Sequence, residues 1–199
     1  MRYLRLFALC LLRLCLWMSP LYAQEITDSS TAFFEGADHA YTVTPPNGFK
    51  LLVDEARRDG YSFAFVPDEA SYDIADLVIL GSYMSMDAEA AADFSFKNFI
   101  ADDTAQMRDY FGDLLTINKV EGITNFEGDT LPTVYLNDTS QFIPTVMISY
   151  FYRPRELFIF ELVISESYPR FKAEDVFVQA LLGFKSLKKG DLSDLTVRK

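Results

Sequence analysis

The stretch that decides the fold is Ile143–Ser165, IPTVMISYFYRPRELFIFELVIS. Its two apolar runs, joined by a tight turn at Arg153–Glu156, predict a β-hairpin. Because neither run alternates with polar residues, both faces of the hairpin must be covered. With the turn centred on Pro154–Arg155, the expected cross-strand pairs are Phe151 with Phe158 and Met147 with Leu162 on one face, and Tyr150 with Ile159 and Val146 with Val163 on the other.

Further strands are predicted on both sides of the hairpin, where short apolar runs end in turn signals. They are expected at residues 39–44, 49–53, 61–66, 75–84, 114–120 and 130–136. The pair Pro46 and Asn47 before Gly48 marks one turn, and residues 58–60 mark another. Gly81 lies inside an apolar run, which indicates a bulge or a close approach of another chain segment.

Two helices are predicted from apolar stripes with helical spacing. The first runs through Ala88–Phe111 after the N-cap residue Asp87, with a break expected near Asp93. The second runs through about Arg170–Leu182, and its expected buried stripe extends to Phe184.

The order of these elements predicts an α+β fold. Short connections favour a mostly antiparallel sheet, and one helix on each face would cover both sides of the hairpin, giving an α/β/α sandwich. The single domain is expected at residues 39–187, after a flexible lead-in at 24–38 and before a polar tail at 188–199.

Residues 1–23 have the pattern of a secretory signal peptide, with early arginines, a short apolar run and a small residue, Ala23, at the expected cleavage site. The alternative is an uncleaved membrane anchor, but Arg13 and Pro20 leave an apolar run shorter than the roughly 20 residues of a span. We therefore expect a periplasmic or secreted protein with no stable membrane span after cleavage. Cys10 and Cys15 both lie in this segment, so the mature chain would have no thiol chemistry.

The charge of the chain argues against nucleic acid as a partner. The formal net charge is −11, and it becomes −14 when the three arginines of the segment 1–23 are removed. Such a surface repels phosphate backbones and anionic membranes.

Sequence signatures of catalysis or cofactor binding are missing. His39 is the single histidine; it could belong to a Ser-His-Asp triad, or it could be a surface residue where a strand begins. No nucleophile elbow, phosphate-binding loop or dinucleotide-binding glycine pattern occurs. One histidine is too few for a zinc site, so we expect no metal and no cofactor.

Carboxylates remain as candidates. Glu161 interrupts the apolar run LFIFELVI. If buried, it could accept a proton or anchor a pocket; otherwise it lies near a rim, wet or paired with an arginine. The acidic pair Asp102–Asp103 and the segment Asn125–Asp129 are expected at the surface, each as a solvated acidic cluster or, alternatively, as a calcium site.

The hairpin tip is a candidate contact surface. Arg153 and Arg155 flank a proline, so their guanidinium groups could meet a carboxylate or phosphate, or could only solubilise the turn. Tyr150 and Tyr152 are expected as exposed aromatic residues beside this tip.

The segments YTVTPPNGF (Tyr41–Phe49), FIFELVIS and VFVQALLGFKSL resemble the Mog1/PsbP-like domains in their order. Those domains have an early strand with a Pro- and Gly-containing turn, and a final hairpin followed by a closing helix. The resemblance implies the same sandwich and a non-enzymatic binding or assembly role, as in photosystem II extrinsic subunits and a Ran-binding protein. No functional residue can be carried over, because no site motif matches.

Three functions are therefore open. The first is an exported, non-catalytic binding or assembly module with a protein partner in the cell envelope. The second is a small-ligand-binding protein or enzyme with an aromatic pocket around Glu161, and the third is a structural subunit of an envelope complex.

Overall fold

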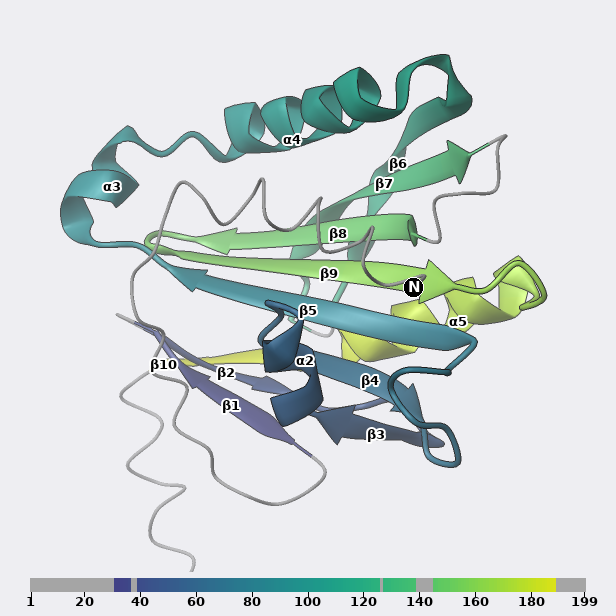
Figure 1. Ribbon diagram of the computed structural model, residues 1–199. Coiled ribbons are helices and arrows are strands. Elements are labelled where there is room, and N and C mark those ends of the chain that lie inside the picture. The colour runs from purple at the N-terminus through teal and green to yellow at the C-terminus, as the bar shows by residue number, and fades with distance from the viewer. Residues whose placement is uncertain (1–30, 37–38, 126, 139–144, 189–199) are drawn as a thin grey trace, which may run out of the picture.

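A seven-stranded antiparallel sheet forms the centre of the molecule (Figure 1). The computed structural model describes residues 31–36, 39–125, 127–138 and 145–188. In spatial order the strands of this sheet are β3 (Phe49–Leu52), β4 (Phe63–Pro67), β5 (Leu77–Ser85), β9 (Glu156–Ile164), β8 (Thr145–Arg153), β7 (Thr130–Asp138) and β6 (Leu115–Thr124). Each pair of neighbours is antiparallel, as the short connections predicted.

A second, three-stranded sheet consists of β1 (Ala32–Glu35), β2 (His39–Val43) and β10 (Phe184–Lys188), with β2 in the middle. The sequence did not predict it as a separate sheet. Residues 32–35 form a strand, which corrects the prediction of a flexible lead-in through 38. The signal segment 1–23 and residues 189–199 of the predicted tail lie outside the described residues, so those boundaries stay predictions.

The helices are α2 (Asp54–Arg58), α3 (Ala88–Asp93), α4 (Phe96–Phe111), a 3-10 turn at Gly112–Leu114, and α5 (Arg170–Leu182). The predicted break near Asp93 is confirmed, because a second N-cap residue, Ser95, accepts a hydrogen bond from Asn98 N at 3.4 Å. Phe184 was wrongly assigned to the last helix. It begins β10, where it lies opposite Val43 of β2.

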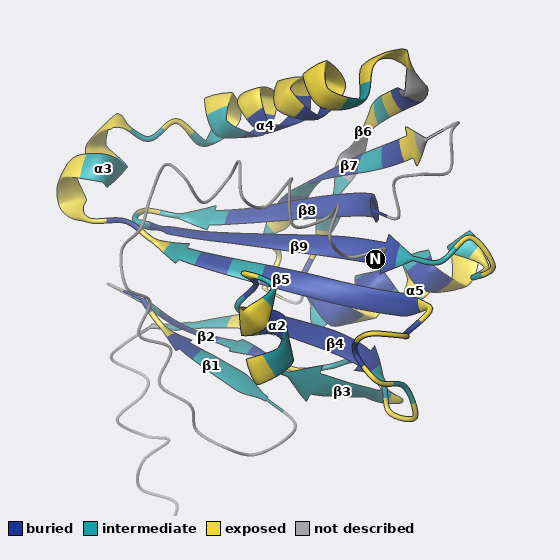
Figure 2. Cartoon of the chain, in the orientation of Figure 1, coloured by how far each residue is buried: buried dark blue, intermediate teal, exposed yellow. Residues whose placement is uncertain are grey.

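Both faces of the β8–β9 hairpin are covered, as predicted. On one face Ile148, Tyr150 and Ile159 pack with Ile100 and Met107 of α4. On the other face, Phe151, Phe158 and Phe160 pack with Phe177 of α5 and with Tyr41 and Phe184 of the small sheet. The buried colouring of β8 and β9 in Figure 2 shows the result. The α+β class with helices on opposite faces is confirmed, and the small sheet shares the face of α5.

The predicted register of the hairpin is confirmed for three of four pairs: Phe151 with Phe158, Met147 with Leu162, and Tyr150 with Ile159. The fourth is wrong, because Val163 lies opposite Thr145 and the register shifts between Thr145 and Met147. Val146 and Met147 both join the cluster on the α5 face. A β-bulge, which inserts one extra residue into a strand, accounts for this.

Gly81 marks a close approach, as its position in the apolar run indicated. It lies opposite Phe63, and a Cβ atom at Gly81 would lie 2.0 Å from Cζ of that ring. Glycine therefore lets the Phe63 ring lie directly on β5.

Candidate functional site

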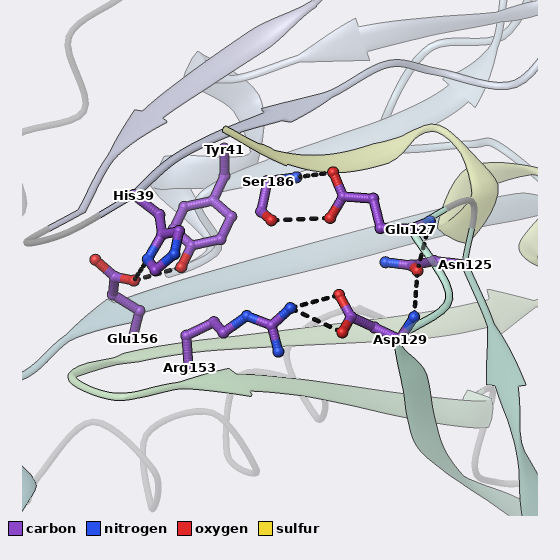
Figure 3. A network of polar contacts seen from close by, with 8 residues as sticks. All are labelled: His39, Tyr41, Asn125, Glu127, Asp129, Arg153, Glu156 and Ser186. Atoms are coloured by element: carbon purple, nitrogen blue, oxygen red, sulfur yellow. Dashed lines mark hydrogen bonds and ion pairs between the residues drawn. The ribbon is translucent and has the colours of Figure 1, made fainter. Parts of the chain in front are cut away.

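The candidate site lies where the tip of the β8–β9 hairpin meets the small sheet and the β6–β7 turn (Figure 3). Arg153 and Glu156 come from the tip, His39 and Tyr41 from β2, and Ser186 from β10. The segment 125–129 connects β6 to β7. Long-range strand pairing brings these groups together, so no short sequence motif contains them.

Glu156 is the centre of one polar cluster. Glu156 is fully buried, although its side chain ends in a carboxylate. Tyr41 Oη donates a hydrogen bond to Glu156 Oε2, and His39 Nδ1 lies 3.7 Å from the same oxygen. Gly36 lies against this carboxylate, since a Cβ atom there would be 1.9 Å from Glu156 Oε1.

The tyrosines of this cluster are held in their neutral form. Burial, the hydrogen bond to Glu156 and its charge raise the pKa of Tyr41 far above the ordinary 10.0. Burial and the charge of Glu156 raise the pKa of Tyr83 to about 12. Because desolvation disfavours the phenolate, both side chains act as hydrogen-bond donors and not as nucleophiles or bases near neutral pH.

For His39 the sequence allows a role in a triad or a position at the surface. Its side chain is 23% exposed, and its Nδ1 atom is buried without a hydrogen-bond partner. The ring centroid lies 6.2 Å from that of Tyr41. Glu156, the acid next to His39, is enclosed by protein. The contact between His39 of β2 and Glu156 of β9 is therefore suited to joining these two strands.

Arg153 forms an ion pair with another residue of the same chain. Its Nη2 atom lies 2.7 Å from both carboxylate oxygens of Asp129, and its guanidinium lies 4.9 Å from the centroid of the Phe151 ring. The side chains of the pair are 34% and 22% exposed. Arg153 therefore ties the hairpin to the β6–β7 turn.

Arg155 has a structural role at the same tip. It adopts a left-handed conformation, with φ of 74°. Its Nε donates to the Met86 carbonyl at 3.2 Å, and its own carbonyl accepts from Met86 N at 2.7 Å. These contacts join the tip to the segment that follows β5.

The acidic turn 125–129, expected as a solvated turn or a calcium loop, is built on internal bonds. Asn125 is buried, and its Oδ1 accepts hydrogen bonds from the backbone N atoms of Glu127 and Asp129 at 3.0 and 2.9 Å. The carboxylate of Glu127 accepts from the backbone N and Oγ of Ser186 at 2.9 and 2.8 Å. Since Asp129 binds Arg153, the carboxylates a calcium ion would need are already engaged.

Tyr150 and Tyr152 differ from the predicted exposed pair. Tyr150 is fully buried and donates to Asp103 Oδ2 at 2.6 Å. Asp103 is 6% exposed, so it too was wrongly placed at the surface. Tyr152 is half-buried and packs on Phe94 and Phe96, with centroid separations of 5.0 and 5.2 Å.

Glu161 is 6% exposed, so the expectation of a wet rim position was wrong. It lies between Leu80 of β5 and Ile148 of β8 in the sheet. By the alternation of strand residues, Glu161 shares the α4 face with Tyr150 and Tyr152, whereas Glu156 and Arg153 point to the small sheet. The five predicted site residues therefore do not form one site.

Glu156 and Tyr41 were not predicted as site residues from the sequence. Glu156 has the same parity in β9 as the buried Phe158 and Phe160, and Tyr41 has the same parity in β2 as His39. This alternation was a usable signal, but it does not reveal which element covers each face.

Over the part of the chain that the structure describes, no three histidine, cysteine or acidic side chains gather as a metal ion would require. Within the same residues no helix has both the length and the apolar character needed to cross a bilayer.

Comparison with known proteins gave a resemblance of fold. No protein-family profile matches the chain, and no curated protein sequence matches it. Among solved structures, the chain is similar to the solution structure of cyanobacterial PsbP (CyanoP) from Synechocystis sp. PCC 6803, with a TM-score of 0.48 and 11% identity. The match covers 83% of this chain and 98% of that chain. This match and the resemblance stated from the sequence concern the same group of proteins.

Proposed function

We propose that this chain is an exported, non-catalytic binding or assembly module whose partner is a protein of the cell envelope. One observation carries the proposal: Glu156, the acid beside the single histidine, is fully buried against Tyr41. A carboxylate in that position supports the docking of two sheets and does not meet a substrate from solution. The signal-like residues 1–23 support export.

The neighbouring charged groups support the same proposal. Arg153, Asp129 and Glu127 each bind another part of the chain. Together these contacts fix the small sheet and the β6–β7 turn against the hairpin. Such a scaffold keeps its outer loops and helix ends in fixed positions, as a binding module requires.

The export half of the proposal is tested by producing the full chain in a Gram-negative host. We expect it in the periplasm, with Gln24 as the first residue by mass spectrometry. A protein that keeps residues 1–23 and stays in the membrane or cytoplasm would contradict this half.

The binding half is tested by site-specific photo-cross-linking in the native envelope. A photoreactive amino acid is placed at exposed Ile74, Tyr110 or Phe171, and at buried Phe177 as the matched control. We expect one discrete protein adduct from an exposed position and none from Phe177. The absence of any adduct from all three exposed positions would contradict a binding role.

A second candidate is a small-ligand site on the α4 face around Glu161, which at 6% exposed is less completely enclosed than Glu156 at 0%. The change Glu161→Gln replaces the acid with little change of shape, and the exposed Glu89→Gln, outside this face of the sheet's core, is its matched control. If Glu161 anchors a ligand, small cationic molecules that raise the Tm of the parent protein should fail to do so for Glu161→Gln alone. Equal stability and equal ligand response in all three proteins would end this candidate.

A further inference from the structure

One end of the large sheet exposes two large apolar side chains. Within the described residues Ile74 is 78% exposed and Phe171 is 66% exposed, and Tyr110 at the end of α4 is the third such residue, at 61%. Ile74 lies in the loop between β4 and β5, and Phe171 lies in the first turn of α5.

The loop and the helix start lie at the same end of the sheet (Figure 1). Leu77, which begins β5, lies opposite Ile164 at the end of β9. Ser165 N also donates to the Asp76 carbonyl at 2.8 Å. We call the exposed part of segments 68–76 and 165–172 the strand-end surface.

The exposed side chains are held in place by buried neighbours. Tyr72 and Ala75, on either side of Ile74, are 7% and 8% exposed and pack in the core beside β4 and β5. Ala173, two residues after Phe171 in α5, is fully buried in the core. The buried neighbours therefore hold the backbone at Ile74 and Phe171 in place, while both side chains leave apolar surface exposed to water.

The surroundings of these two side chains are acidic. Five exposed carboxylates belong to the strand-end surface: Asp68, Glu69, Asp73, Asp76 and Glu166. The nearby cations are fewer. Lys50 Nζ donates to the Asp68 carbonyl at 3.0 Å, Lys172 is exposed, and Arg170 pairs with Glu174 at 3.0 Å.

We propose that the strand-end surface docks a protein segment that carries apolar side chains next to lysine or arginine. The proposal rests on the proposed function and names the chemistry of its partner. Apolar anchors within a charged rim are typical of protein contacts, and a rim of one sign selects a partner of the other. A second copy of this chain would bring its own carboxylates against these, and an anionic membrane would be repelled.

The test is a titration of the ¹⁵N-labelled chain with defined peptides, followed by NMR. The probe alternates leucine and lysine; one matched peptide has glutamate for lysine, and another has serine for leucine. We expect the probe alone to shift amide signals of segments 68–76 and 165–172, with an affinity that falls as salt is raised.

Variants of the chain make the result specific. The double change Ile74→Ser with Phe171→Ser should weaken binding at least about tenfold, by the usual effect of removing anchor residues. Tyr110→Ser removes the third exposed apolar side chain and should leave the affinity unchanged. A melting curve of each variant confirms that it folds.

Signals that shift only elsewhere, equal binding of the glutamate peptide, or an unchanged affinity of the double variant would each overturn the proposal. Sedimentation showing a dimer that Phe171→Ser dissociates would assign the surface to a second copy instead. If cross-links in the envelope arise from Tyr110 but not from Ile74 or Phe171, this inference fails while the binding function stands. If none of the three positions cross-links, the binding function itself fails.

Discussion

At the scale of single residues, the buried carboxylate of Glu156 is held by the Tyr41 hydroxyl and the neighbouring His39. Burying a charged group is costly unless hydrogen bonds replace those it made with water. The small sheet can therefore dock on the hairpin only if these contacts to Glu156 form. Loss of one of them should lower the free energy of unfolding.

We predict that Tyr41→Phe lowers the free energy of unfolding by about 1–3 kcal/mol, because it leaves a buried carboxylate without one donor. Urea denaturation measures this. Tyr83→Phe is the control, since the Tyr83 hydroxyl lies 3.4 Å from its acceptor, the Glu35 carbonyl, and its loss should cost less. A Tyr41→Phe protein as stable as the parent would show that the hydrogen bond contributes nothing.

Alkaline pH should destabilise the fold through the same tyrosines. The pKa of Tyr83 rises from 10.0 to about 12 on folding, so above pH 10 the unfolded chain loses a proton that the folded chain keeps. The contribution of the neutral Tyr83 side chain to the free energy of unfolding is fully present below pH 10. It is lost as the pH rises towards 12, at about 1.4 kcal/mol per pH unit. Tyr83→Phe should flatten this decline, measured by urea denaturation across that range; an unchanged slope would contradict the account.

At the scale of elements, the hairpin and the last helix could be predicted because their signals are local. The apolar runs on both sides of the turn determine the β8–β9 pairs, and the apolar stripe with its flanking residues determines α5. The bulge at Val146 could not be predicted, since it depends on how β8 fits β7 and β9 together.

The small sheet and the Glu156 cluster were missed for a related reason. β10 pairs with β2, from the other end of the chain, and no short motif records such a pairing. Strand alternation places Tyr150 and Glu161 on one face, but their exposure depends on what covers that face, here α4 and its Asp103.

Gly81 tests the packing of β4 on β5. We predict that Gly81→Ala costs about 1–3 kcal/mol in stability, because the new Cβ atom would overlap the Phe63 ring. Ser82→Ala, at the next and half-buried position, is the matched control and should cost less. Equal urea midpoints for the two variants would show that Phe63 does not lie against Gly81.

At the scale of the whole molecule, one aromatic cluster joins the two sheets. Phe184 of β10 is fully buried, and its ring centroid lies 4.8 Å from that of Phe151 and 4.9 Å from that of Phe158. Tyr41 of β2 stacks on Phe184 with a centroid separation of 5.8 Å, and its ring centroid lies 4.8 Å from that of Phe158. The small sheet and the large sheet should therefore unfold as one cooperative unit.

We predict that Phe184→Ala lowers the free energy of unfolding by about 3–5 kcal/mol, as for other fully buried phenylalanines. Phe171→Ala, at an exposed position, should change it by less than about 0.5 kcal/mol. Thermal unfolding followed by tyrosine absorbance and by circular dichroism should give one transition in both variants. Two separate transitions for Phe184→Ala would mean that the sheets are independent units.

The fold described above depends on a hairpin that is enclosed on both faces, and neighbouring residues of β8 test this enclosure directly. Met147 faces α5 and Ile148 faces α4, and each is 1% exposed. Met147→Cys and Ile148→Cys are compared with the exposed Ile74→Cys, each in a chain with Cys10 and Cys15 replaced by serine. We predict that a thiol reagent labels both buried cysteines at least about a thousandfold more slowly than the one at position 74, because labelling must await opening of the fold. Labelling of either at the rate found at position 74 would show that one face of the hairpin is open to water, and would contradict the account.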